Sequence, residues 1–137
     1  MVFGFSIVVG LLVLGILVFI HELGHFTVAK LFGIRVLTFS LGFGKPLIVK
    51  HIGDTDYRIS AIPFGGYVHM AGENPQEGTG DDPAEFNNKP PWQRACVAVA
   101  GPAMNVLFSF VLLWGVFVIG IEEPLYLENT TVGAVTD

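Results

Sequence analysis

Two long stretches of the chain contain no charged residue. The first runs from Val2 to Ile20 and the second from about Ala95 to Ile121. At the rise of an α-helix, the first stretch measures roughly 28 Å, which is close to the hydrocarbon thickness of a bilayer. A secretory signal peptide would carry basic residues before the first stretch and a cleavage pattern after it. A buried helix of a soluble protein, the alternative for the second stretch, is usually shorter. We therefore predict two transmembrane helices, within segments 1–32 and 95–121.

Between these stretches, apolar residues partly alternate with polar ones. "FSLGFGKPLIVK" (39–50) and "YRISAIPFGGYVHM" (57–70) are rich in β-forming residues and flank the turn-like "HIGDTD" (51–56). This pattern is typical of a β-hairpin, and Pro46 and Pro63 indicate edge or bulged positions. The hairpin is too apolar to be fully solvated, so we expect it to be membrane-associated beside the first helix. A hairpin that only covers the cytoplasmic face is the alternative. The predicted fold class is an α-helical membrane protein, with two transmembrane helices and this hairpin between them.

Composition and charge restrict the location and the partners. The chain is 52% hydrophobic and 14% charged, with mean hydropathy +0.63, unlike an ordinary soluble domain. The net charge of −5 and the lack of a basic cluster exclude nucleic acid as a partner. All basic residues lie between the apolar stretches: Lys30, Arg35, Lys45, Lys50, Arg58, Lys89 and Arg94. The positive-inside rule then places segment 33–94, which holds the hairpin and a polar loop, in the cytoplasm, with both chain ends outside the plasma (inner) membrane.

The sequence HELGH follows the first apolar stretch without a break. His21 and His25 are four residues apart and share one helix face, while Glu22 lies about 100° round the helix. Two imidazoles at this spacing bind zinc, and the glutamate serves as general base toward a water molecule. Ionisable groups continuous with a spanning helix are expensive and indicate function. The alternative is that they snorkel at a helix end. Gly24 leaves space for another element to approach.

The second apolar stretch contains one strongly polar residue near its middle, Asn105. An unpaired amide would be costly there, so we expect it to have a partner. Gly101 lies four residues earlier on the same helix face and allows close contact with another helix. Pro102 frees the backbone carbonyl of Ala98. For both Gly101 and Asn105, a packing role and a catalytic role remain open.

Several stretches, taken in order, resemble the site-2 protease family. They are HELGH, "FSLGFGKPL", "YRISAIPFGGYVHMAGE", "KPPWQRACVAVAGPAMN" and "TTVGAVTD". They are most similar to the bacterial branch that cleaves anti-sigma factors, the regulator-of-sigma-E protease type. The resemblance covers nearly the whole chain. It implies a Zn2+-dependent intramembrane endopeptidase with His21 and His25 as metal ligands and Glu22 as catalytic base. The implied substrate is a single-span transmembrane protein similar to an anti-sigma factor.

The resemblance also implies roles for other segments. "PFGGYV" resembles a membrane-reentrant β element near the active site, so we expect Phe64, Gly65, Gly66 and Tyr67 to contact the substrate. Gly101 to Asn105 match a GxxxN pattern that packs close to the HExxH helix, and we expect Asn105 to contact the substrate as well. The closing "VGAVTD" resembles the first strand of a PDZ domain. Segment 122–137 would then begin an extracytoplasmic PDZ-like region.

One element of the family pattern does not occur in the sequence. The third zinc ligand of the family is an aspartate in an LDG motif on a later span, and no LDG is present. We therefore expect an N-terminal part of a longer enzyme, inactive without the remaining C-terminal part. Two other functions remain open. One is a membrane protein that binds metal without hydrolysis, and the other is a membrane scaffold whose polar residues only join helices.

Overall fold

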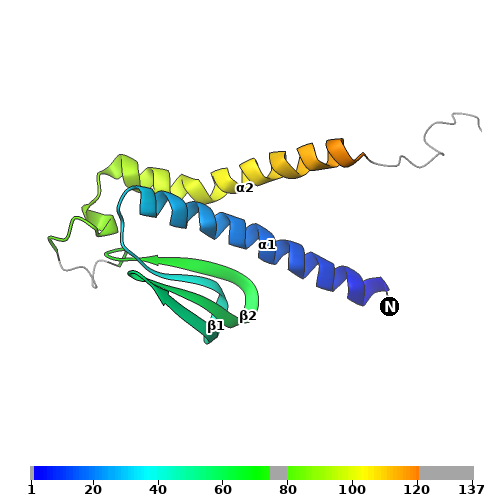
Figure 1. Cartoon of the computed structure of the whole chain (residues 1–137), viewed down its shortest axis with the longest axis horizontal. Helices are drawn as coiled ribbons and strands as arrows, with labels where there is room; N and C mark the ends of the chain where they lie inside the picture. Colours follow the sequence, from blue (N-terminus) through cyan, green and yellow to red (C-terminus); the bar gives the residue numbers. More distant parts are fainter. Residues whose placement is uncertain (1, 75–79, 121–137) are drawn as a thin grey trace, which may run out of the picture.

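The structure, a computed structural model, describes residues 2–74 and 80–120. Along the chain it consists of α1 (Val2–Leu31), β1 (Val36–Ile52), β2 (Thr55–Met70), the short 3-10 helix η1 (Phe86–Asn88) and α2 (Pro91–Ile119), as Figure 1 shows. Two helices flanking a β-hairpin are the elements that the sequence predicts. The expected PDZ-like region, 122–137, lies outside the described residues.

Both helices are long and apolar enough to cross a membrane. The apolar side chains of their outer turns are exposed, including Phe5 at 71% and Phe117 at 78%. α2 begins at Pro91 and not at Ala95, because proline is well suited to the first turn of a helix. Arg94 is charged and therefore marks the end of the apolar stretch, but a charged residue does not interrupt a helix. It ends before Gly120, whose φ of 82° breaks the helix.

β1 and β2 pair as an antiparallel hairpin that folds over on itself. The second half of β1 pairs with the start of β2, where Val49 faces Arg58. The first half of β1 has partners on both sides, since Phe39 pairs with Val68 on one side and with Tyr57 on the other. The paired segments therefore lie side by side in the order 46–52, 55–60, 36–43 and 66–70.

Buried hydroxyl groups hold the folded sheet together. Thr55 Oγ1 donates a hydrogen bond to the Val36 carbonyl oxygen at 2.8 Å, and the Ser40 and Ser60 hydroxyls lie 3.1 Å apart.

The middle segment, 36–43, runs parallel to 55–60, because the residue numbers of the paired positions increase together along both segments. Segment 66–70 has a strand partner on one side only among the described residues. It is therefore an edge.

The hairpin turn is tighter than predicted. It lies between Ile52 and Thr55, where Gly53 has a φ of 62°, and His51 and Asp56 are paired strand residues instead of turn residues. Hydrogen bonds from Arg58 and then from His51 hold the pKa of the Asp56 carboxyl below its usual range. The glycine conformation closes the turn within two residues, which the composition of the predicted segment does not reveal.

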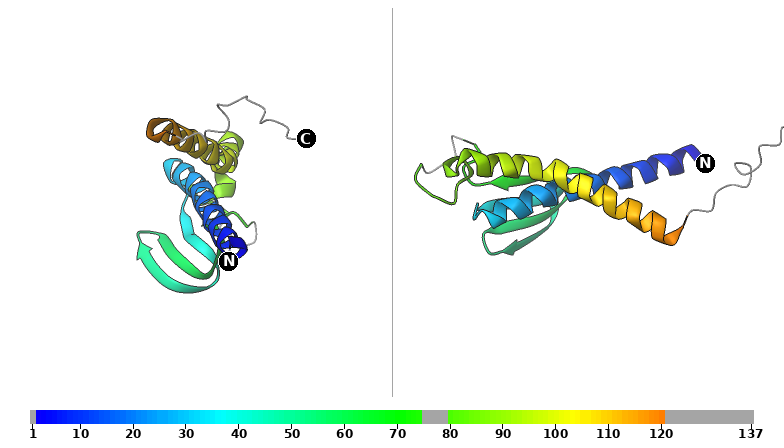
Figure 2. Two further views of the ribbon diagram at one scale, coloured as in Figure 1. Left: turned by 90° about the vertical axis from the view of Figure 1, so that its right-hand side faces the viewer. Right: turned by 90° about the horizontal axis from the view of Figure 1, so that it is seen from above.

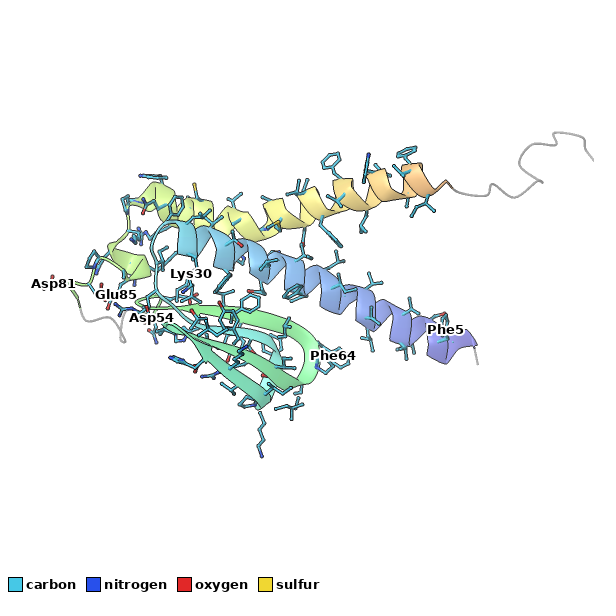
Figure 3. All side chains as sticks on the ribbon, in the orientation of Figure 1. Phe5, Lys30, Asp54, Phe64, Asp81 and Glu85 are labelled. Carbon is cyan, nitrogen blue, oxygen red and sulfur yellow. The ribbon has the colours of Figure 1, made fainter. Side chains whose placement is uncertain are left out.

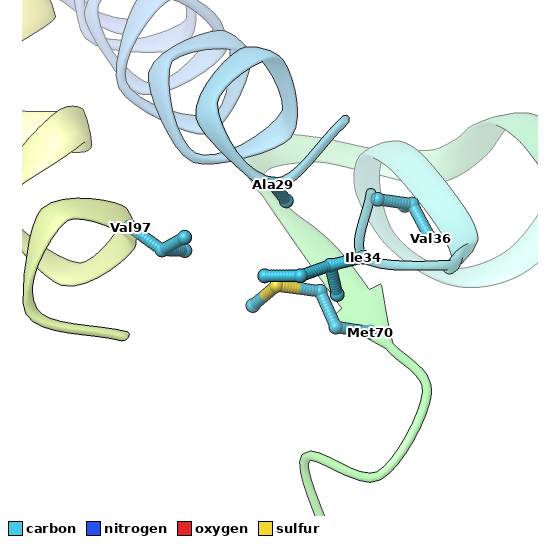
Figure 4. Packing of buried hydrophobic residues seen from close by; sticks show 5 residues of the cluster. All are labelled: Ala29, Ile34, Val36, Met70 and Val97. Carbon is cyan, nitrogen blue, oxygen red and sulfur yellow. The ribbon is translucent and has the colours of Figure 1, made fainter. Parts of the chain in front are cut away.

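The three layers meet near the C-terminal end of α1. Figure 2 shows α1 between α2 and the sheet. Close to this meeting point a small core forms, shown in Figure 4, from Ala29, Ile34, Val36, Met70 and Val97. Both long helices and both strands contribute to it, so this cluster fixes the helices and the sheet relative to one another. It lies one to two helical turns from His21 and His25.

Candidate active site

The rings of His21 and His25 project from α1 toward α2. Their centroids are 4.8 Å apart, with the planes at 75°. A Cβ atom added to Gly101 of α2 would overlap the Nε2 atoms of both rings. The two Nε2 atoms therefore border one shared space, which exists because residue 101 has no side chain. Two imidazole nitrogens facing a common space are the start of a zinc coordination shell.

The other ring nitrogen of His25 is fixed by α2. His25 Nδ1 lies 2.7 Å from the carbonyl oxygen of Val97. A carbonyl oxygen can only accept, so Nδ1 carries the hydrogen and the Nε2 of a neutral ring keeps its lone pair. A backbone carbonyl in this position is a common outer partner of metal-binding histidine, because it sets the tautomer and the ring orientation. The geometry thus prepares His25 Nε2 to bind a cation.

Asn105 of α2, for which the sequence predicts a polar partner, contacts a site residue. Its Nδ2 atom lies 3.3 Å from His21 Nδ1. The structure therefore brings Asn105 against a candidate metal ligand. Its predicted contact with a substrate stays a prediction.

Glu22 faces the sheet instead of α2. The Val68 backbone forms a hydrogen bond with its carboxyl group, and its Cγ atom would lie 3.4 Å from a Cβ atom at Gly66. Residues 66 and 68 belong to the edge segment of β2, so the carboxylate lies between the metal-facing rings and a strand edge. Glu22 points in a different direction from His21 because adjacent residues of an α-helix are offset by about 100° round its axis.

A close helix crossing holds these groups together. A Cβ atom at Gly24 would overlap the Ala100 carbonyl oxygen and lie 3.0 Å from the Cβ atom of Met104. Gly24 and Gly101 thus both face the partner helix where the axes approach. The predicted role of Gly24 as a site of close approach agrees with this packing. Trp92 contacts Phe32 edge-on at 5.4 Å between ring centroids, at the end of the same crossing.

The other predicted substrate-binding residues are consecutive positions of β2. Gly66 lies beside Glu22, whereas Phe64 and Gly65 border a separate apolar cavity of about 490 Å³ between α1 and the bend of the sheet. In Figure 3, Phe64 lies at this bend, far from Lys30. The Tyr67 ring stacks on Phe43 at 6.2 Å and 12°. Only Gly66 of this group reaches the candidate active site directly.

Sequence reasoning missed three contributions to the site. Val97 supplies the His25 acceptor, although Pro102 frees the neighbouring carbonyl of Ala98. Val68 contributes through its backbone, which no side-chain motif reveals. Glu73 belongs to segment 33–94, which the sequence places in the cytoplasm, and it shares a cavity of about 200 Å³ with His25. The turn at Gly72, with a φ of 69°, brings it back over the end of β2.

The described residues do not supply a third metal ligand to this arrangement. Within residues 2–74 and 80–120, no group of three or more His, Cys, Asp or Glu side chains is placed to hold a metal ion. Glu73 shares the cavity with His25 without completing such a group. The two histidines fit zinc as a partial ligand set.

Comparison with known proteins gives the family. "Peptidase family M50" matches residues 9–136. The chain belongs to peptidase family M50. This confirms the resemblance to site-2 proteases that the motifs indicate. A Clostridium acetobutylicum protein named "Putative zinc metalloprotease" is 41% identical over 132 residues, which are 96% of this chain and 37% of that protein.

Other M50 relatives show the same relation. A Chlamydia trachomatis protein with the same printed name is 44% identical over 134 residues, or 91% of this chain and 22% of that protein. A Synechocystis relative, also so named, is 46% identical over 104 residues, or 75% of this chain and 28% of that protein. The chain thus spans between about a fifth and two fifths of these relatives.

Proposed function

We propose that this chain carries the catalytic base and two zinc ligands of an intramembrane metalloendopeptidase. The observation that carries the proposal is the arrangement around Gly101. The His21 and His25 Nε2 atoms border one space, and Glu22 projects from the next position of the same helix toward a strand edge. The family and the names of its relatives support a zinc-dependent peptidase. The remaining zinc ligand would come from the C-terminal part of the enzyme.

The reaction is hydrolysis of a peptide bond. Zinc, when bound by His21 and His25, would polarise the scissile carbonyl and make the attacking water more acidic. The Glu22 carboxylate takes the proton from that water and delivers it to the leaving amine. The Val68 backbone contact orients the carboxylate for this transfer. Both proton transfers then occur at one side chain.

The substrate would be a transmembrane helix of a single-span protein similar to an anti-sigma factor. Its scissile segment must unwind, because helical carbonyls are already hydrogen-bonded. Segment 66–70 of β2 can hold the unwound segment by strand addition, since it is an edge and lies beside Glu22. Phe64 and Gly65 would contact apolar side chains of the substrate deeper along α1. Asn105, in contrast, is turned toward His21.

We also propose that α1 and α2 span the inner membrane, with the sheet entering it from the cytoplasmic side. Their length, composition and exposed apolar surface support this. Backbone at membrane depth is tolerated where protein or a wet cavity surrounds it. The sheet meets that condition on the side that packs against α1. Water would reach the site from the cytoplasm.

The test measures zinc content and cleavage of a transmembrane substrate. The chain is prepared alone and co-expressed with the C-terminal part of a longer relative that carries an LDG motif. We expect weak zinc binding and no cleavage from the chain alone, and a gain of both on co-expression. Glu22→Gln should keep zinc and slow cleavage by about 10²-fold or more, since it removes the proton acceptor. Asp81→Asn, an exposed acid away from the site, is the matched control.

Four results would contradict the proposal. Unchanged cleavage in Glu22→Gln would remove Glu22 from the mechanism. Full activity of the chain alone would require a third ligand within it. Zinc-free protein in which His21→Ala changes nothing would favour the membrane scaffold, and stable zinc without any cleavage would favour a metal-binding protein that is not a protease.

A further inference from the structure

The two candidate ligands have unequal partners at Nδ1. His25 Nδ1 faces a carbonyl oxygen, which fixes the hydrogen on that atom. His21 Nδ1 faces the Asn105 side-chain amide, with Nδ2 at 3.3 Å. The other end of this amide, Oδ1, is buried and has no hydrogen-bond partner within the described part of the chain. The amide therefore leaves its acceptor unused while its donor contacts a ring nitrogen.

The direction of this hydrogen bond decides which tautomer His21 adopts. If Asn105 Nδ2–H donates to Nδ1, a neutral ring carries its hydrogen on Nε2, pointing into the space beside Gly101. A protonated Nε2 cannot bind a metal ion. If the amide is rotated by 180° about its terminal torsion, Oδ1 accepts from Nδ1–H instead. The two ends of an amide are almost equal in size, so this rotation needs no repacking.

We propose that Asn105 is a positioning residue for His21, with its Oδ1 accepting a hydrogen bond from His21 Nδ1–H. This orientation pairs the oxygen and places Nδ2 at the unpartnered end, and it leaves the Nε2 lone pair of His21 facing the same space as that of His25. Each histidine then has one carbonyl-type acceptor from α2: the Val97 backbone for His25 and, eight residues later on that helix, the Asn105 side chain for His21. The use of this bond in catalysis rests on the proposed function, whereas the bond itself does not.

The residue type fits this role better than a packing role. A purely apolar contact at position 105 would be served by leucine or alanine, without burying a polar oxygen in the helix interface. The Ser109 hydroxyl donates to the Asn105 backbone carbonyl at 2.9 Å, so it leaves the side-chain amide free to serve His21. Outer partners of this kind typically change metal affinity by about 10- to 100-fold when removed.

The experiment reads the histidine tautomers directly in the chain without metal. The chain is labelled with ¹⁵N-histidine, placed in detergent micelles above pH 8, and its ring nitrogens are observed by long-range ¹H–¹⁵N correlation. We expect the Nδ1–H tautomer for both His21 and His25. Asn105→Leu should move His21 to the Nε2–H tautomer and leave His25 unchanged, which also shows that the variant is folded. Asn105→Asp should keep the Nδ1–H tautomer, because a carboxylate oxygen can accept the same bond.

A metal titration gives the second readout. Binding of Co²⁺ alone should weaken by about 10- to 100-fold in Asn105→Leu and be retained in Asn105→Asp. Ser109→Ala, which removes a hydroxyl one turn away, should change neither the tautomer nor the affinity. The Nε2–H tautomer of His21 in the unaltered chain would overturn the proposal. So would Asn105→Leu with an unchanged tautomer and unchanged Co²⁺ affinity, the result expected if Asn105 only contacts substrate. Unchanged proteolysis in Glu22→Gln, which would overturn the proposed function, has no effect on these measurements, so the two proposals fail separately.

Discussion

At the scale of single residues, a missing side chain matters as much as the imidazoles that face it. Gly101 has no Cβ atom where the Nε2 atoms of His21 and His25 approach α2. Alanine is intrinsically better than glycine in a helix by about 0.8–1 kcal/mol. Gly101→Ala should therefore leave the helix intact, but its methyl group fills the space that a cation would use. We expect at least a 10-fold loss of Zn²⁺ affinity, measured by competition with a chromophoric chelator.

Gly115 of the same helix is the matched control for that change. A Cβ atom there would meet nothing within 4 Å, so Gly115→Ala gains the same helix propensity without a clash. It should bind Zn²⁺ as the unaltered chain does. Equal affinity of the Gly101→Ala and Gly115→Ala chains would show that the metal does not occupy the space beside Gly101.

The same scale shows which site residues a sequence can reveal. His21, Glu22 and His25 are predictable because a helix fixes their relative positions through its own period. Val97, Val68 and Glu73 are not, since each joins the site only after α2, the sheet edge and the turn at Gly72 pack around α1. Two of these three act through backbone atoms, which any residue type carries.

At the scale of elements, the crossing of α1 and α2 depends on Gly24. A side chain there would overlap the Ala100 carbonyl oxygen, so Gly24→Val should separate the helices. Overpacking of this kind typically costs about 1–3 kcal/mol. With Phe32 and Trp92 replaced by cysteine in a Cys96→Ala background, disulfide formation reports on the crossing, because these positions are in contact in the unaltered chain. Gly24→Val should slow the crosslink strongly.

Gly10→Val, on the same helix but with open space around the added Cβ atom, is the comparison. It should crosslink as fast as the parent chain. Equal rates for Gly10→Val and Gly24→Val would mean that the helices do not approach at Gly24.

The sequence predicts both helices from their uncharged runs, and it predicts the hairpin from residue type. The folding over of the sheet depends on buried partners such as Thr55 and Val36, which come together only when β1 bends.

At the scale of the whole molecule, the charge distribution and the position of the sheet together predict how the protein is oriented in the membrane. All Lys and Arg residues lie at positions 30–94, between the apolar runs, which predicts that the hairpin turn is cytoplasmic. Figure 3 shows Asp54 at the Lys30 end of the sheet and Phe64 at the opposite bend. Near that bend, the Pro63 carbonyl oxygen would lie 3.6 Å from a Cβ atom at Gly15. Gly15 precedes His21 by roughly 9 Å of helix, so the bend should lie deeper in the bilayer than the active site.

Cysteine labelling can test both the cytoplasmic location of the hairpin turn and the deeper position of the bend. Single cysteines are placed at Asp54, Phe64 and Asn129 in a Cys96→Ala chain and exposed to a membrane-impermeant thiol reagent. In intact spheroplasts, we expect Asn129→Cys to react and Asp54→Cys to be shielded. Asp54→Cys should react once the membrane is opened, because the reagent then reaches the cytoplasmic side. Phe64→Cys should still resist labelling until detergent dissolves the bilayer, since its side chain lies beside the apolar first half of α1.

Labelling of Asp54→Cys from outside would reverse the orientation and place the active-site opening on the other face. Labelling of Phe64→Cys as fast as Asp54→Cys in opened membranes would instead place the bend in water and contradict the re-entrant position of the sheet.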